Sequence, residues 1–187
     1  SDLVHATVEE RCRVVVMGWS AGKISGASEL IERVAGSLRS DLLFLSQSRD
    51  VAPRRIGVAL GATANLPLMV RAAVALAEDF GGDVRYLTVV PEHMSARHLR
   101  RAREIQIAAM ERHTGLVAFC SELVRSDNPL EALVERSAQL DLLVIGSADL
   151  PTLGDVGLGG FAPMVAARAD CSVLVVRRGS RPLVPPR

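Results

Sequence analysis

Hydrophobic residues are grouped along this chain in short runs that alternate with longer, more polar segments. Seven runs are rich in Val, Leu and Ile and are expected to form β-strands: residues 14–17, 42–45, 56–60, 84–90, 119–124, 142–145 and 173–176. Continuous apolar runs of this length are typical of strands that are covered on both faces, as in a parallel sheet. The pattern therefore favours an α/β fold.

Segments with helical spacing separate the later runs. Residues 66–80 end at Gly81-Gly82, and they are expected to bury one face made of Leu68, Ala72, Ala75 and Leu76. Residues 95–112 are rich in arginine and begin with Ser95, a candidate N-cap. Asn128 followed by Pro129 predicts the start of a helix that continues through Leu140. Alternating strands and helices between residues 55 and 177 predict right-handed crossovers and a doubly wound sheet.

The chain also contains an internal repeat. Gly18 corresponds to Gly146, and Val34-Ala35 corresponds to Val165-Ala166, with the same spacing from that valine to the final strand of each copy. We interpret residues 1–50 as the C-terminal half of a first domain and residues 53–179 as a complete second domain of the same plan. Residues 180–187 contain three prolines and are expected to form a flexible tail.

Composition and charge exclude several classes of function. The net charge is +1 and aromatic residues make up 3% of the chain, which argues against a nucleic-acid partner. The longest apolar segment, residues 66–77, is interrupted by Arg71, and no signal peptide is visible. Three widely spaced cysteines, Cys12, Cys120 and Cys171, predict neither a disulfide framework nor a zinc site. A reducing, cytoplasmic location is the simplest expectation.

Two segments of the chain resemble the universal stress protein family. The segment RRIGVALGATANLPLMVRAAVALAEDFGGDVRYLTVVPE resembles the opening of such a domain, and DLLVIGSADLPTLGDVGLGGFAPMVAARADCSVLVVRR resembles its closing half. Residues 1–50 are similar to the closing half alone, as in tandem members of the family. The resemblance implies an adenine-nucleotide α-hydrolase-like fold, a doubly wound parallel five-stranded sheet of order 3-2-1-4-5, with an N-terminal half-domain of the same plan.

Such a sheet binds ligands where its strand order reverses, between the carboxyl ends of strands 1 and 4. The residues expected to form this site are Leu60, Gly61, Ala62, Val90, Gly146, Ser147, Asp149, Gly157, Gly159 and Gly160. No catalytic residue and no metal ligand is expected among them. In ATP-binding members of the family, an aspartate follows the first strand, and a loop of pattern G, two residues, G, nine residues, G, then Ser or Thr holds the phosphates.

This chain departs from the ATP-binding pattern at three positions. Leu60 stands at the place of the aspartate, Asp149 replaces the second glycine, and Gly160 replaces the Ser or Thr. Asp149 adds a negative charge, and no Lys or Arg occurs between Gly146 and Ala167. Because a phosphate needs donors and cations around it, ATP is a disfavoured cofactor and no other cofactor is expected.

These features favour a non-catalytic regulatory or ligand-sensing module rather than an enzyme. In the family, tandem copies also follow the membrane part of some cation antiporters and amino-acid permeases, so the membrane domain of a transporter is a candidate partner. The alternative is a stand-alone stress-response protein that binds ATP or another adenine nucleotide. An enzyme such as a nucleotide hydrolase is the third reading, with only Asp149 and Asp155 as loop candidates for its chemistry.

The final strand predicts a further contact. It would be an apolar edge, which proteins usually cover, and family members pair this edge with another copy. Leu42 to Leu45 is the equivalent strand of the first half-domain. We therefore expect another domain of the same plan, in the same chain or in a homodimer, to pair with Val173, Leu174, Val175 and Val176.

Overall fold

In the part of the chain that the structure describes, a mixed β-sheet carries helices on both faces. The computed structural model describes residues 12–18, 40–48, 50–61, 63–147 and 160–179. Within them the sheet contains β1 (Val14–Gly18), β2 (Asp41–Ser46), β3 (Arg55–Leu60), β4 (Asp83–Val90), β5 (Phe119–Arg125), β6 (Leu142–Gly146) and β7 (Ser172–Arg177). The helices are α3 (Leu66–Phe80), α4 (Ala96–Met110), α5 (Pro129–Ser137) and α6 (Phe161–Arg168).

The strand order is β1-β2-β7-β6-β3-β4-β5. All neighbouring pairs from β7 to β5 are parallel. Counted from β3 as the first strand, this part of the sheet has the order 3-2-1-4-5, as the sequence analysis predicted. The strand order therefore reverses between β3 and β6, and their carboxyl ends flank the crevice in which such sheets bind ligands.

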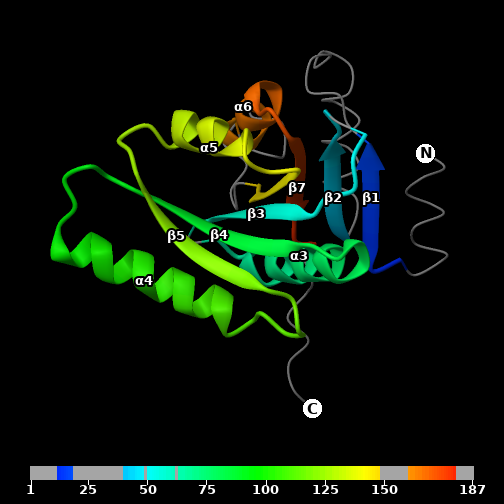
Figure 1. The fold of residues 1–187 in the computed structure, drawn as a ribbon, viewed down its shortest axis with the longest axis horizontal. Coiled ribbons are helices and arrows are strands. Elements are labelled where there is room, and N and C mark those ends of the chain that lie inside the picture. Colours follow the sequence, from blue (N-terminus) through cyan, green and yellow to red (C-terminus); the bar gives the residue numbers. More distant parts are fainter. Residues whose placement is uncertain (1–11, 19–39, 49, 62, 148–159, 180–187) are drawn as a thin grey trace.

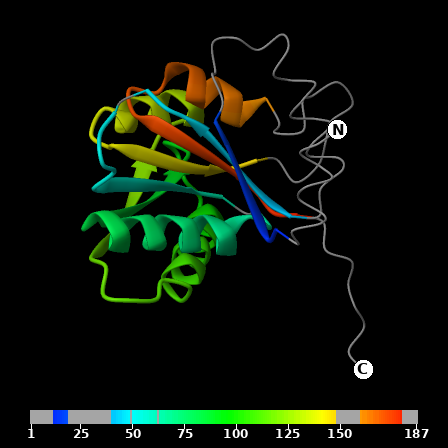
Figure 2. The same ribbon diagram turned by 90° about the vertical axis from the view of Figure 1, so that its right-hand side faces the viewer.

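The two faces of the sheet are covered by different helices (Figures 1 and 2). α3 and α4 lie on one face, where Ile56, Val58 and Val144 are fully buried against α3. α5 and α6 lie on the other face, over Leu143 and Val175. Burial on both faces explains why these strands are continuous apolar runs rather than alternating ones.

The helices largely match the predicted segments. α3 has the predicted bounds and ends at Gly81 in the left-handed conformation, with φ of 65°. The expected position of Ala75 on its buried face is wrong, since Ala75 is exposed and the buried residues are Leu66, Leu68, Met69, Val70, Ala73, Val74 and Ala77. α3 is apolar around most of its circumference, so spacing alone does not define its packed face. α5 ends at Ser137, before the expected Leu140.

β2 lies antiparallel beside β7, within the same chain. Leu42 pairs with Arg177, Phe44 with Val175 and Ser46 with Val173. Leu42 and Phe44 are 2% and 0% exposed, and they share a core cluster with Val173 and Val175. The sheet thus continues through β2 into β1, which is parallel to β2.

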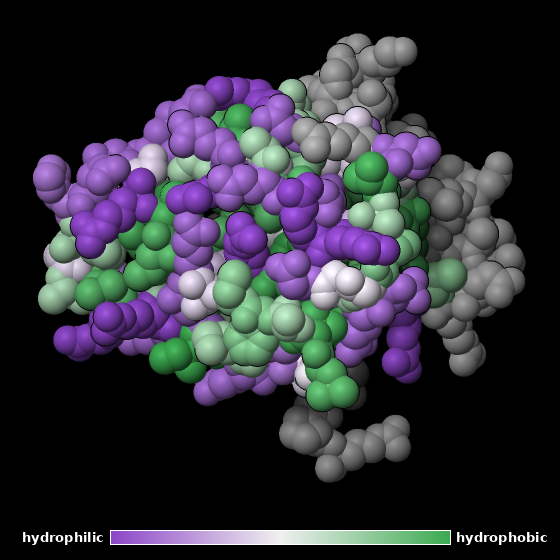
Figure 3. Space-filling view, in the orientation of Figure 1, coloured by the Kyte–Doolittle hydropathy of each residue, from purple (hydrophilic) through white to green (hydrophobic). Residues whose placement is uncertain are grey.

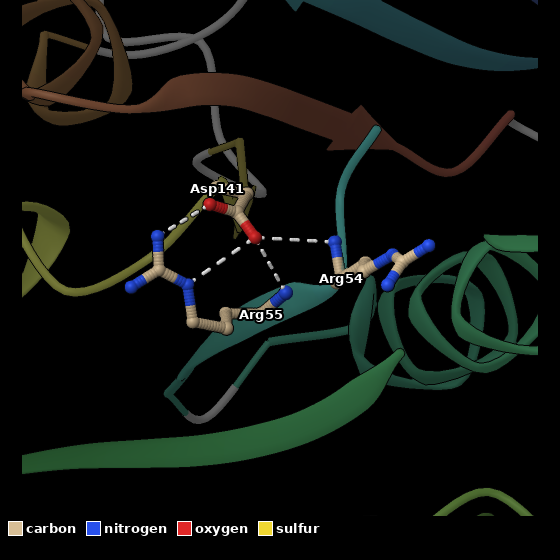
Figure 4. A network of polar contacts seen from close by, with 3 residues as sticks. All are labelled: Arg54, Arg55 and Asp141. Carbon is tan, nitrogen blue, oxygen red and sulfur yellow. Dashed lines mark hydrogen bonds and ion pairs between the residues drawn. The ribbon is translucent and has the colours of Figure 1, made fainter. Parts of the chain in front are cut away.

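A carboxylate ties two strands together at the amino end of the sheet (Figure 4). Asp141 directly precedes β6, and its Oδ2 accepts hydrogen bonds from the backbone amides of Arg54 at 3.2 Å and Arg55 at 2.8 Å. Its Oδ1 accepts a hydrogen bond from Nη2 of Arg55 at 2.6 Å. These contacts anchor the start of β3 to β6 at the edge opposite the crevice.

Candidate ligand crevice

A cavity of about 240 Å³ lies at the carboxyl ends of β3, β4 and β6, under the start of α5 and α6. It is lined by Ala59, Leu60, Gly61, Thr63, Leu87, Val89, Pro129, Leu133, Ile145, Gly146 and Phe161. This is the place where the strand order reverses, so its position agrees with the general rule for ligand sites in open α/β sheets. Its volume is slightly below the range of roughly 300–1,000 Å³ that is usual for small-molecule pockets.

Most of the side chains that line this crevice are apolar. Thr63 supplies the one side-chain hydroxyl among the described lining residues, and none of them carries a charge. Leu60 ends β3 at the wall of the crevice and is 8% exposed. The described side chains therefore offer a neutral or apolar group a hydrophobic surface, but they offer an anion few donors.

Polar groups gather directly behind this lining. Asn65 is 2% exposed, and its Nδ2 donates a hydrogen bond of 2.9 Å to the carbonyl oxygen of Ser147. Its Oδ1 accepts a hydrogen bond of 2.7 Å from the amide of Arg178. The amide of Ser147 donates to the carbonyl oxygen of Val176. Asn65 thus connects the loop after β3 to the carboxyl ends of β6 and β7.

Close packing also restricts the end of β6. A Cβ added at Gly146 would lie 3.0 Å from Sδ of Met69 and 3.4 Å from Cβ of Asn65. A larger residue at this position would push against α3 and the loop before it. A glycine at position 146 therefore keeps the end of β6 close to α3, next to the crevice.

The structure brings only part of the predicted site together. Leu60, Gly61 and Gly146 line the crevice. Ser147 is 3% exposed and lies behind the lining, in contact with Asn65. Gly160 is the N-cap of α6. Ala62, Asp149, Gly157 and Gly159 lie outside the described residues.

Val90 does not line the crevice and is 4% exposed, whereas its neighbour Val89 does line it. Consecutive residues of a strand point to opposite faces of the sheet, so only one of the two can contribute to a cavity on one face. The predicted site residue Val90 therefore lies outside the lining of the cavity, and Val89 beside it belongs to the lining. Both residues are valines because both faces of β4 are covered.

Sequence reasoning missed the lining residues that come from the helical side. Phe161 begins α6, and Pro129 and Leu133 belong to α5. Thr63 lies in the loop after β3. The expected crevice lies at the carboxyl ends of the strands, where the following helices begin. This position is the signal by which the residues at the start of α5 and α6 could have been added to the predicted site.

A second, more open hollow lies beside the crevice and shares Gly61 and Thr63 with it. Its volume is about 350 Å³, and α4 contributes Arg101, Glu104, Ile105 and Ala108. Nη1 of Arg101 lies 3.6 Å from Oε2 of Glu104 on the same helix. The other arginines of this helix, Arg97, Arg100 and Arg103, are exposed, as expected for a solvated helix face.

The described residues contain no group of three or more His, Cys, Asp or Glu side chains arranged to hold a metal ion. Cys171 is buried among the apolar residues of the α5–α6 side, whereas Cys12 and Cys120 are exposed. Within the same described part of the chain, no helix combines the length and the apolar character needed to cross a bilayer.

The strand order and the crevice define a doubly wound α/β protein with a cavity at its switch point. The profile of the universal stress protein family matches residues 53–177, and the chain belongs to this family. A universal stress protein of Thermus aquaticus, named for the 3′ region of a QAH/OAS sulfhydrylase, is 33% identical over 121 residues. That match covers 57% of this chain and 87% of the relative.

Solved structures with low sequence identity share the fold. A universal stress protein from Archaeoglobus fulgidus in complex with dAMP is 17% identical, with a TM-score of 0.57 over 68% of this chain and 100% of the other. The cytoplasmic domain of a prokaryotic cation chloride cotransporter is 14% identical, with a TM-score of 0.64. This second match covers 93% of our chain and 69% of the cotransporter domain.

Proposed function

We propose that this chain is a non-catalytic regulatory or ligand-sensing module of the universal stress protein family, acting in the cytoplasm, with a degenerate ATP site. The observation that carries the proposal is the apolar wall of the crevice, above all Leu60 at the end of β3. An aspartate is expected at this position in ATP-binding members. A leucine there can pack against a ligand but cannot accept a hydrogen bond from it.

The charges around the crevice support this proposal. None of the described lining residues is a cation, and the sequence from Gly146 to Ala167 contains Asp149 and Asp155 but no Lys or Arg. A carboxylate about 4 Å from a phosphate charge costs roughly 4 kcal/mol near a protein surface. A micromolar affinity corresponds to about 8 kcal/mol, so repulsion of this size removes a large share of it.

Titration calorimetry with ATP, ADP and AMP in the presence of magnesium is expected to detect no micromolar binding. The same measurement on a triple variant, Leu60→Asp, Asp149→Gly and Gly160→Ser, is expected to detect tighter binding, because this variant restores the family pattern. The triple variant also controls for an inactive preparation of the protein. A micromolar dissociation constant for the unaltered chain would contradict the proposal.

One observation favours the alternative, a stand-alone stress-response protein that binds ATP or another adenine nucleotide. The hollow next to the crevice contains Arg101, and both spaces share Gly61 and Thr63. A nucleotide with its base in the crevice could direct its phosphates to this arginine, although Glu104 already pairs with it. If the unaltered chain binds a nucleotide and Arg101→Ala weakens that binding, this alternative replaces our first proposal.

We further propose that the module is the cytoplasmic part of a membrane transporter and that the membrane domain is its partner. Support comes from the fold shared with the cytoplasmic domain of a cation chloride cotransporter, over 93% of this chain. A second domain of the universal stress protein plan is the other proposed partner, through β7 in this chain or in a homodimer. The antiparallel pairing of β2 with β7 supports the arrangement within this chain rather than the homodimer.

The transporter proposal is tested by the reading frame upstream of Ser1. We expect it to encode a strand and a helix of the universal stress protein type, preceded by hydrophobic segments of about 20 residues each. An upstream frame that encodes neither would contradict the transporter assignment, and it would leave the proposal for the crevice unaffected.

A further inference from the structure

Large hydrophobic side chains are exposed at the last turn of α4, in the loop after it and at the start of β5. They are Ile107 at 55%, Met110 at 40%, Leu116 at 103% and Phe119 at 42% exposure. The residues that α4 buries are the small side chains Ala102 and Ala109. Figure 3 shows hydrophobic surface in the lower part of the molecule, where the end of α4 and the start of β5 lie in Figure 1. The four exposed residues form the α4–β5 patch, and a group of this kind, unlike a single exposed residue, indicates a contact surface.

His113 ties the loop between α4 and β5 to the strands beside it. Its Nδ1 lies 2.8 Å from the hydroxyl oxygen of Tyr86, a fully buried residue of β4. Its Nε2 lies 3.0 Å from the carbonyl oxygen of Val117. The imidazole ring also lies against Phe119, with 4.3 Å between the ring centroids. These contacts position the loop, and they leave Leu116 fully exposed to solvent.

Two arginines lie on the same face of α4 as the helical part of the patch. The members of this face are spaced three, four and three residues apart, and they are Arg100, Arg103, Ile107 and Met110. Residues three and four apart are neighbours on the surface of a helix. All four side chains are exposed. The face is therefore cationic toward the start of α4 and apolar toward its end, where the loop continues the patch.

Net positive charge is concentrated on this helix. Residues 96–112 contain five arginines and two glutamates and so carry a net charge of +3, whereas the whole chain carries +1. One of the glutamates, Glu104, lies 3.6 Å from Arg101. On the other side of the loop, the Glu78 carboxylate of α3 lies against Gly115. The cationic side of the α4–β5 patch is thus the α4 side, and its charge is complementary to an anionic surface.

We propose that the α4–β5 patch binds the surface of a lipid bilayer that contains anionic lipids. The four apolar side chains would enter the boundary between headgroups and acyl chains, while Arg100 and Arg103 contact the anionic headgroups. Long arginine side chains suit this arrangement, because their apolar stems can lie along the apolar layer while the guanidinium groups stay among the headgroups. The patch lies on the bilayer in this arrangement and does not cross it.

The shape and charge of the patch favour a lipid surface over a protein partner. Leu116 is fully exposed, and neither the crevice nor the hollow beside it includes a residue of the patch. A helical protein segment typically docks into a groove, whereas a bilayer takes up side chains that project from a surface. An anionic bilayer also offers acidic and apolar environments within roughly 10 Å of depth. This inference does not depend on the proposed function of the crevice or on the transporter assignment.

Vesicle sedimentation of the full chain tests the proposal. The affinity for vesicles of phosphatidylcholine mixed with phosphatidylserine is expected to exceed that for phosphatidylcholine alone by about tenfold or more. Added salt should weaken the binding, because it screens the attraction between arginines and headgroups.

The cationic part of the surface is tested by Arg100→Gln together with Arg103→Gln. This double variant should bind the mixed vesicles about tenfold or more weakly, since each arginine near an anionic surface contributes to the attraction. The matched control is Arg13→Gln together with Arg178→Gln, which removes the same charge from two exposed positions, before β1 and after β7. This control should bind as the unaltered chain does.

The apolar part is tested by Ile107→Ser together with Leu116→Ser. Both side chains are exposed, so the fold should be retained, and the affinity for mixed vesicles should fall by about tenfold or more. The matched control is Val14→Ser together with Val16→Ser on β1, at the opposite end of the described sheet. These valines are 45% and 63% exposed, and their replacement should leave the affinity unchanged.

A tryptophan in the loop then distinguishes insertion from attraction by charge alone. Trp19→Phe removes the one native tryptophan, and Leu116→Trp places a new one in the patch. Its fluorescence is expected to shift to shorter wavelength on mixed vesicles and to be quenched by lipids with brominated acyl chains. Val16→Trp in the same background should show neither change.

Several results would overturn the proposal. Equal binding to neutral and mixed vesicles would do so, and so would the absence of binding to both. Fluorescence of Leu116→Trp that mixed vesicles leave unchanged would exclude insertion of the loop. Control variants that lose as much affinity as the patch variants would exclude a specific surface. A homodimer of the unaltered chain that Ile107→Ser with Leu116→Ser dissociates would assign the patch to a contact between copies instead.

Discussion

A chain that begins at residue 51 is expected to dimerise or aggregate at concentrations where the intact protein does not. Removing residues 1–50 removes β2, which pairs with β7 over five residue pairs. The truncated sheet would end in a strand whose residues Val173 to Val176 are all less than 5% exposed in the intact chain. An uncovered apolar edge with free main-chain groups is a template for pairing with another chain.

The side chains lost with β2 add to this effect. Phe44 and Leu42 fill the core cluster under α5 and α6, together with Val173 and Val175. Each of these two large residues contributes roughly 1.5–3 kcal/mol through burial. Their loss leaves a depression beside β7 as well as an open edge. Two truncated chains would pair antiparallel through their β7 strands, so that each covers the apolar edge of the other. This is the arrangement that β2 and β7 have in the intact chain.

Sedimentation velocity or light scattering of the 51–187 chain measures the outcome directly. A chain of residues 12–187, which retains β1 and β2, is the control for shortening of the polypeptide, and it is expected to behave as the intact protein does. A well-behaved monomer of residues 51–187 would count against the role assigned to β2.

Asp141→Ala is expected to lower the free energy of unfolding by about 2 kcal/mol at neutral pH, since hydrogen bonds to a charged group contribute roughly 1.5–3 kcal/mol. The substitution removes the acceptor for the amides of Arg54 and Arg55 and for the Arg55 guanidinium. The side chain of Asp141 is 12% exposed, while that of Arg55 is 50% exposed. The two backbone amides should therefore account for more of the loss than the ion pair. Arg55→Gln, which keeps both amides bonded, should cost less.

The contribution of the Asp141 carboxylate to the free energy of unfolding depends on pH. The side-chain hydrogen bond from Arg55 holds the pKa of Asp141 below its usual value, against the opposing effect of burial. Because the folded-state pKa is lowered, the stabilisation is fully present above the unfolded-state pKa of about 3.9. It is lost as the pH falls through the lowered folded-state value.

Urea unfolding of the parent chain and of Asp141→Ala between pH 7 and pH 2 measures this dependence. The difference in stability should be constant at neutral pH and should shrink below about pH 4. A difference that stays the same down to pH 2 would contradict the assignment of the stabilisation to the charged carboxylate.

Much of the fold follows from local patterns in the sequence. All seven predicted strands are present, and α3 has its predicted bounds. The cap and the proline at Asn128-Pro129 begin α5, with Oδ1 of Asn128 accepting a hydrogen bond from the amide of Glu131. These elements depend on side-chain periodicity and on groups only a few residues apart, so a short stretch of sequence carries the information. The strand order followed from the family resemblance, and the observed sheet confirms it.

The composition of the crevice was only partly predictable. Leu60, Gly61 and Gly146 were expected because they end strands that flank the switch point. Thr63, Leu133 and Phe161 come from a loop and two helices, and their convergence depends on how those elements pack on the sheet. Val89 and Val90 are both apolar because β4 is covered on both faces, so hydrophobicity does not indicate which one faces the cavity.

The sequence by itself determined which of the described segments become strands and helices. It also predicted that two parts of the chain are equivalent, and the family resemblance implied that Leu60 stands where ATP-binding members have an aspartate. The tertiary structure decided which face of α3 is buried, which valine of β4 lines the crevice, and that Val14 and Val16 are exposed while their equivalents Leu142 and Val144 are buried. Periodicity is a local property of the chain. Burial depends on which other elements pack against a residue, and equivalent residues in a repeat differ where one copy is covered and the other is open.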